Sequence, residues 1–196
     1  MTIADRIKKS IDSMEQGDIE ESLTQVCIAI DITVKNLYEL DRSSGQKYKE
    51  FISEYMWLIS YMGIPTLMAS TIRVPLKHKD VKSDSNGCCG IEDVIFHIIR
   101  CKLIHSTGPG SSIIWGENPI CSMKGEGLVL SKNLVWGLIG SVVFCPINKN
   151  ESIDESYWIS VDDFKFFIQE VWGRIDLAVR VIKLNNKILD ISVPHL

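Results

Sequence analysis

The sequence predicts a mainly α protein with a small β element at one edge, and three observations support this prediction. Apolar residues recur at the three- and four-residue spacing of a helix face along most of the chain. Residues that cap helices precede several of these stretches. Alternating stretches that favour strands are confined to short segments near 112–130 and 157–160. We therefore expect a helical bundle that forms a single domain over residues 1–196.

Composition and charge agree with a folded protein that has its own core. The chain has 196 residues, of which 45% are apolar and 23% charged, and this length suffices to bury a sizeable core. The net charge of −4 gives no global attraction to nucleic acid, so RNA binding would need a local patch or a groove shared between subunits. The chain start lacks a signal-peptide pattern, and the longest apolar run, 134–147, is too short for a membrane span. We expect a cytoplasmic protein without membrane contact.

Two amphipathic helices are expected first, over 2–16 and about 19–40. Thr2 and Asp18 stand where a side chain can cap each of them. Gly17 separates the two helices. The apolar residues of the first helix fall on one stripe: Ile3, Ile7, Ile11 and Met14.

A third helix is expected over about 46–61, after a turn at 41–45. On the helix before it, Asp31 and Lys35 are spaced as an i,i+4 ion pair. Residues 63–90 are the least regular stretch and contain a basic cluster: Arg73, Lys77, His78, Lys79 and Lys82. This cluster is either a solvated loop or a contact to a phosphate backbone.

The fourth helix is expected over about 91–106, where a buried apolar stripe recurs. Asp93, His97 and Arg100 follow at i, i+4 and i+7, so an α-helix would place them on one face. His105 falls at the end of this helix. Arginine is a fixed cation that suits phosphate geometry, and histidine can exchange protons near neutral pH.

The remainder of the chain is expected to continue the bundle and to add the β element. Two short strands within 112–130 could pair as a hairpin or a small sheet. Ser131 would cap an apolar helix to about 145, 157–159 would be extended, and a final helix would run over about 161–183. The tail over 188–196 is expected to be extended.

We expect no metal and no cofactor. Six cysteines occur, none in a C-x-x-C pair, and the neighbouring Cys88 and Cys89 lack a second ligand pair at suitable spacing. Four of the five tryptophans are interpreted as packing residues rather than base-stacking platforms: Trp115, Trp136, Trp158 and Trp172.

The motif Arg100-Cys101-Lys102-Leu103-Ile104-His105 resembles the R-x(4–6)-H motif of the HEPN superfamily. Ala29-Ile30-Asp31 and a Lys/Phe-rich helix with Lys47, Lys49 and Phe51 precede it in the expected order. The resemblance covers about 19–107 and leaves about 108–196 as a C-terminal extension. It implies a helical bundle that dimerises, and many HEPN proteins are metal-independent ribonucleases in toxin–antitoxin or phage-defence systems.

By this resemblance, Arg100 and His105 would be the catalytic residues, meeting their counterparts across a homodimer cleft. Arg100 would hold the phosphate, and His105 would transfer protons to and from the reacting oxygens. Asp93 could orient Arg100 or His97 as supporting groups, and Lys102 could add a phosphate contact. The family pattern usually has a polar residue directly after the arginine, whereas this chain has Cys101.

Three hypotheses follow for the function. The first is an RNA-cleaving homodimer that has an antitoxin or another protein as a partner, favoured by the Arg100 and His105 pair. The second is a catalytically silent HEPN-like helical module that binds a protein or nucleotide, favoured by Cys101. The third is a chance motif in an unrelated helical protein.

Overall fold

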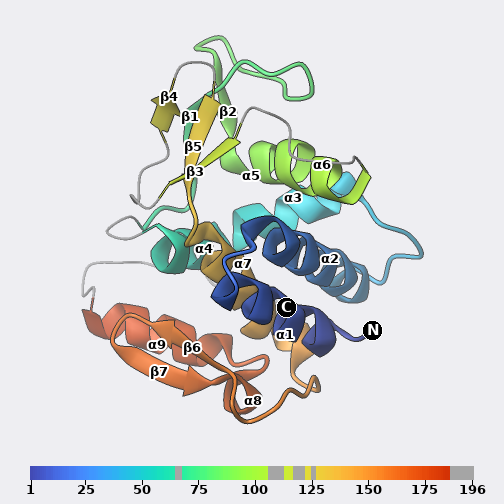
Figure 1. The fold of residues 1–196 in the computed structure, drawn as a ribbon, viewed down its shortest axis with the longest axis vertical. Coiled ribbons are helices and arrows are strands. Elements are labelled where there is room, and N and C mark those ends of the chain that lie inside the picture. Colours follow the sequence, from blue (N-terminus) through green and yellow to red (C-terminus); the bar gives the residue numbers. More distant parts are fainter. Residues whose placement is uncertain (65–67, 106–112, 117–121, 125–126, 186–196) are drawn as a thin grey trace.

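The structure of the protein is a computed structural model that describes residues 1–64, 68–105, 113–116, 122–124 and 127–185. Helices make up most of these residues, so the prediction of a mainly α protein is confirmed. Figure 1 shows a central group of helices, with small strands at one end and the β6–β7 hairpin with α9 at the other. The tail over 188–196 and Cys121 lie outside the described residues.

The first two helices form as expected, and their caps are visible. In α1 (Ile3–Glu15) the Thr2 hydroxyl accepts the N–H of Asp5 at 3.0 Å, and the Asp5 carboxylate accepts the N–H of Thr2 at 2.8 Å. This reciprocal capping box satisfies two donors that a helix start leaves free. Asp18 caps α2 (Ile19–Leu37) by accepting the N–H of Glu21. The second helix ends at Leu37 rather than near residue 40.

Two buried serines join α1 to α2. The Ser10 hydroxyl lies 2.9 Å from the Ser22 carbonyl oxygen, and the Ser22 hydroxyl donates to the Ser10 carbonyl at 2.7 Å. Both side chains are fully buried. Their hydroxyls are therefore satisfied, and their small size lets the two helices approach closely.

The expected helix over 46–61 is two helices, α3 (Gly45–Glu54) and α4 (Met56–Gly63), with the break at Tyr55. The Tyr55 ring stacks on Phe51 with ring centroids 4.6 Å apart, and both rings are fully buried. All residues from Met56 to Ser60 are buried. Five consecutive buried residues leave no apolar stripe with a polar face opposite it, so sequence periodicity could not detect where one helix ends and the next begins.

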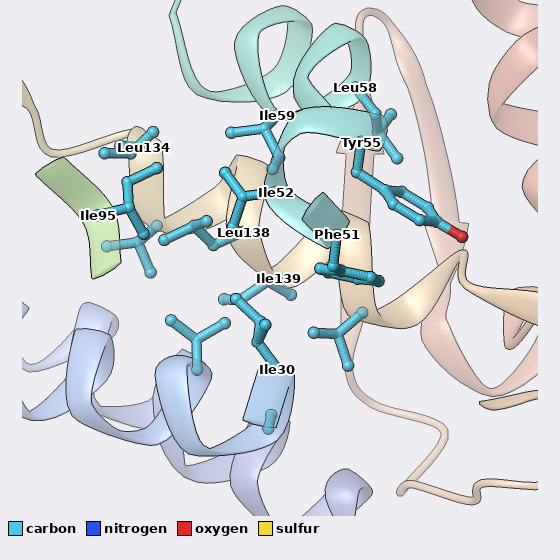
Figure 2. Packing of buried hydrophobic residues seen from close by; sticks show 14 of the residues in the cluster. Ile30, Phe51, Ile52, Tyr55, Leu58, Ile59, Ile95, Leu134, Leu138 and Ile139 are labelled. Carbon is cyan, nitrogen blue, oxygen red and sulfur yellow. The ribbon is translucent and has the colours of Figure 1, made fainter. Parts of the chain in front are cut away.

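The core is built around α7 (Leu134–Val143), which packs on α4 and α2. Figure 2 shows Leu138 and Ile139 of α7 between Ile59 of α4 and Ile30 of α2. A Cβ atom added at Gly137 would lie 2.2 Å from the Ile59 carbonyl oxygen, so the backbones of α7 and α4 are nearly in contact there. The apolar run that is too short for a bilayer is therefore the buried centre of the molecule. Among the described residues, no helix is both long and apolar enough to cross a bilayer.

The expected helix over 91–106 is present but is not a regular α-helix. It comprises α5 (Ile91–Asp93), a π-helical segment η1 (Val94–Arg100) and α6 (Cys101–His105). A π-helix closes its hydrogen bonds over five residues instead of four, so each turn is wider. This segment alters which side chains share a face.

The expected irregular stretch over 63–90 contains a β-hairpin. Strands β1 (Arg73–Pro75) and β2 (Cys88–Gly90) pair antiparallel, with Val74 opposite Cys89. The basic cluster therefore begins on a strand rather than in an open loop.

The two strands expected within 112–130 form, but they do not pair as a hairpin. Strands β3 (Ile113–Gly116) and β5 (Gly127–Ser131) are parallel neighbours. A further strand, β4 (Ser122–Lys124), pairs antiparallel with β5 on its other side. The result is the small sheet that the second alternative anticipated.

The prediction of a final helix over 161–183 is wrong for the first half of this range. Strand β6 (Trp158–Val161) turns at Asp162, whose φ is 51°, into the antiparallel strand β7 (Phe164–Phe167). Two helices follow, α8 (Ile168–Val171) and α9 (Ile175–Asn185). The left-handed backbone of Asp162 permits a tight hairpin, and aspartate adopts this conformation more readily than most residues.

The segment after α7 returns to cover α1. The carboxylate of Glu151 accepts the N–H of Ala4 at 2.9 Å. Lys8 and Asp154 form an ion pair at 2.5 Å. The connection begins with a 3-10 turn, Pro146–Asn148, in which the buried Asn148 amide donates to Thr33 of α2 and to the Val142 carbonyl.

Candidate functional site

Arg100, the first predicted catalytic residue, is held by an aspartate of another helix. Its Nε and Nη2 atoms lie 3.0 and 2.9 Å from the same carboxylate oxygen of Asp31 in α2. The Asp31 carboxylate also accepts the Ser43 hydroxyl at 2.8 Å, and the Arg100 guanidinium lies 5.3 Å from the centre of the Phe96 ring. Only 12% of the Arg100 side chain and 15% of the Asp31 side chain are exposed. The sequence spacing predicts that Asp31 pairs with Lys35, whereas in the structure Asp31 pairs with Arg100.

The interaction with Asp31 favours the protonated, positively charged form of Arg100 in this largely buried position. Burial acts to lower the pKa of Arg100, but the hydrogen bonds and charge of Asp31 outweigh it and raise the pKa overall. Burial also raises the pKa of the neighbouring Cys27 thiol to about 12. Cys27 therefore remains a protonated thiol and is not a nucleophile at neutral pH.

Asp93 and His97 lie close to each other, and Asp93 pairs with a lysine rather than with Arg100. The Asp93 carboxylate is 2.9 Å from the Lys49 ammonium of α3 and 4.0 Å from Nε2 of His97. The His97 ring meets Phe96 edge-on at a centroid distance of 4.9 Å. Asp93 is engaged by Lys49 and His97, and Arg100 by Asp31.

Lys102 and His105 follow on α6. The Lys102 ammonium is 3.3 Å from Nε2 of His78. Partial burial and the charge of Lys102 lower the pKa of His78. His105 is the last residue of α6, and its side chain lies outside the described part of the chain.

The π-helical segment explains why Asp93 and Arg100 do not share one helix face as predicted. Asp93 and Arg100 are seven residues apart, and seven residues complete almost two turns of an α-helix. The wider turns between Val94 and Arg100 rotate Arg100 away from Asp93 and toward α2. Among the predicted site residues whose side chains are described, Asp93 and Arg100 therefore have different ion-pair partners. Sequence spacing alone gave no signal for this, because it assumes a regular helix.

The basic cluster is partly neutralised by its own hairpin. Arg73 donates to the Asp84 carboxylate at 2.6 Å, and Asp84 also accepts the N–H groups of Asn86 and Cys88 at 2.8 and 2.9 Å. The N–H of Cys88 is the main cause that lowers the pKa of Asp84 below its ordinary 3.8, with Asn86 and Arg73 adding to it. The expected phosphate contact of this segment stays a prediction.

The lowered pKa of Asp84 predicts a pH-dependent contribution to stability. Because the pKa of Asp84 is lower in the folded state than in the unfolded state, its contribution to the free energy of unfolding is complete above pH 3.8. This contribution is lost as the pH falls through the pKa that Asp84 has in the folded protein. We expect the difference in unfolding free energy between wild type and Asp84→Asn to be constant from about pH 7 to about pH 5, and to shrink below about pH 4. Urea unfolding at a series of pH values measures this difference. A difference that does not change with pH would contradict the assignment.

A second candidate site is a cavity of about 600 Å³ between the end of α1, the start of α7 and strand β6. Its walls combine three aromatic side chains with polar and acidic ones: Trp136, Tyr157, Trp158, Asn133, Asp12 and Glu15. Its volume is in the range of small-molecule sites. No sequence pattern predicts this cavity, and Trp136 and Trp158, which are predicted to be packing residues, line it.

One wall of the cavity is fixed by a hydrogen bond between distant elements. The Tyr157 hydroxyl donates to the Asp12 carboxylate at 2.6 Å, and this bond raises the pKa of Tyr157. Trp158 is 46% exposed, although large aromatic side chains are normally covered in a folded protein. The cavity therefore presents a positioned carboxylate and an accessible indole to solvent.

Within the described residues, no cluster of three or more histidine, cysteine or acidic side chains has the geometry to hold a metal ion. The described cysteines are free thiols, and Cys88 and Cys89 lie on β2. A family model described as Rv1289 matches residues 2–193 of the chain. No curated protein and no solved structure was found to match it.

Proposed function

This chain belongs to the Rv1289 family, and we propose that it is a catalytically silent helical binding module. The observation that supports this proposal is the engagement of Arg100 by Asp31 through two nitrogen atoms, in a position where 12% of the side chain is exposed. A phosphate-binding arginine must offer its donor fork to the substrate. In this chain Asp31 already occupies part of that fork, and its negative charge opposes an incoming phosphate.

Three further features favour a binding role over ribonuclease activity. Cys101 stands where the HEPN pattern usually has a polar residue, and its thiol lies 3.8 Å from Nη1 of Arg100. Asp93, which the ribonuclease hypothesis uses to orient Arg100 or His97, is paired with Lys49. The aromatic and acidic cavity near α1 offers a concave site of the kind that binding proteins use.

RNA cleavage in the presence of EDTA tests this proposal. We expect purified wild-type protein to leave structured and single-stranded RNA intact, and Arg100→Ala and His105→Ala to behave the same way. The alternative, a metal-independent HEPN ribonuclease, predicts cleavage by wild type that both substitutions abolish. Far-UV circular dichroism must show that each variant is folded, because Arg100→Ala removes an ion pair.

The mass of the protein in solution provides a second measurement. The ribonuclease alternative needs Arg100 and His105 from two subunits, so it predicts a homodimer at micromolar concentration. Light scattering on the purified protein separates monomer from dimer. Cleavage of RNA by a dimer, with loss in both variants, would overturn the silent-module proposal.

A further inference from the structure

The cavity between α1, α7 and β6 has the chemistry of a site for an organic cation. Of the described residues that line it, the charged ones are both acidic, namely Asp12 and Glu15. Neither forms a salt bridge with a lysine or arginine of the described chain. Lys8, whose ammonium pairs with Asp154, lies 5.3 Å from the centre of the Tyr157 ring, and its charge also interacts with Asp12. Two lining carboxylates that form no salt bridge of their own still favour a positively charged ligand.

The aromatic side chains that line the cavity also attract positive charge. Trp136, Tyr157 and Trp158 line the cavity, and the faces of such rings attract cations, most strongly for tryptophan. The chain itself provides an example, because the Lys165 ammonium lies 4.0 Å from the centre of the Trp158 ring. Lys165 is exposed and is not one of the lining residues.

The site is preorganised by contacts that do not involve a ligand. The Tyr157 hydroxyl fixes one Asp12 oxygen at 2.6 Å, so this carboxylate and this ring are held together. Trp158 is part of strand β6 and pairs with Phe167 of β7. The elements that carry the lining residues are far apart in sequence but are joined by the core, so Asp12 and Tyr157 need not be ordered when a ligand enters.

We propose that this cavity binds a small organic cation with a quaternary or alkylated ammonium group. This inference rests on the proposed function as a binding module and names the class of its ligand. Aromatic side chains that surround such a group, supplemented by carboxylates, are a recurrent way to recognise it without metal or phosphate chemistry. The volume of about 600 Å³ leaves room for a ligand larger than the ammonium group alone.

Isothermal titration with choline chloride tests the proposal, with 3,3-dimethyl-1-butanol as the neutral analogue of the same shape. We expect choline to bind at least about tenfold more tightly than the alcohol, because only choline gains the cation–π and carboxylate interactions. Equal affinities, or no binding of choline, would overturn the cation site.

Two matched pairs of variants locate the binding. Glu15→Gln removes a lining charge from an exposed position, and Asp163→Asn removes a charge from the β6–β7 turn outside the cavity. Trp158→Leu removes a lining ring, and Phe164→Leu removes an exposed ring of the same hairpin that does not line the cavity. We expect each lining variant to weaken choline binding by roughly fivefold, and each control to change it less than about twofold. Equal effects within either pair would place the binding elsewhere and overturn the proposal.

The two proposals fail in different experiments. RNA cleavage that depends on Arg100 and His105 would overturn the silent module but leave choline binding intact. Failure to bind choline in a protein that does not cleave RNA would remove the cation site and leave the silent module standing.

Discussion

Replacing Gly137 by alanine is expected to destabilise the protein by about 3 kcal/mol. The new Cβ atom would lie 2.2 Å from the carbonyl oxygen and 2.9 Å from the carbonyl carbon of Ile59. These are backbone atoms of α4, so the clash can be relieved only by moving one helix relative to the other. Alanine gains about 1 kcal/mol of helix propensity over glycine, which does not offset a displacement of the central helix pair. Urea unfolding of wild type and variant measures the difference.

Gly140 provides the matched control for this experiment, because it lies on the same helix. A Cβ atom there would meet the sulfur of Met62 at 2.5 Å, but this atom belongs to a flexible side chain that can move. We expect Gly140→Ala to remain within about 1 kcal/mol of wild type. Equal losses in the two variants would mean that the close approach of α7 to Ile59 is not what limits stability.

Removing either partner of the Arg100 and Asp31 pair is expected to cost about 2–3 kcal/mol. Both side chains are largely covered, so Asp31→Ala leaves a poorly hydrated guanidinium without the Asp31 carboxylate, and Arg100→Ala leaves the Asp31 carboxylate without the guanidinium. Most of the loss comes from the group that remains. We therefore expect the double variant to lose clearly less than the sum of the two single losses.

Lys35→Ala is the control for the ion-pair experiment. Sequence spacing pairs Lys35 with Asp31, whereas the structure gives Asp31 to Arg100. We expect Lys35→Ala to change the unfolding free energy by less than about 0.5 kcal/mol. Additive effects of the Arg100 and Asp31 variants, or a Lys35 effect as large as theirs, would contradict the assigned pairing.

Features that depend on neighbouring residues could be predicted from the sequence. Thr2 and Asp18 were identified as caps because a cap needs only the residue and the helix that follows it. The apolar stripe of α1 is regular because only one of its faces is buried. These local signals, repeated along the chain, were sufficient for the mainly α class.

Features that depend on distant contacts could not be predicted in the same way. The break at Tyr55 is followed by five consecutive buried residues, and the tight turn at Asp162 interrupts the range over which a helix is predicted. Asp31 and Arg100 are 69 residues apart, and their pairing requires a π-helical segment that no spacing rule anticipates. The aromatic and acidic cavity combines residues of α1, α7 and β6, so no short motif describes it.

The covering of α1 by residues near 150 has a consequence for synthesis of the protein on the ribosome. The bond between Asp12 and Tyr157 spans 145 residues, and the bond between Ala4 and Glu151 spans 147. At about 5–20 residues per second, roughly 7 to 30 seconds separate translation of α1 from translation of the segment that covers it. During this interval α2 is the helix available to cover α1, and the Ser10 and Ser22 pair can already form. The nascent chain therefore leaves part of this amphipathic helix exposed to chaperones until the segment near residue 150 has been translated.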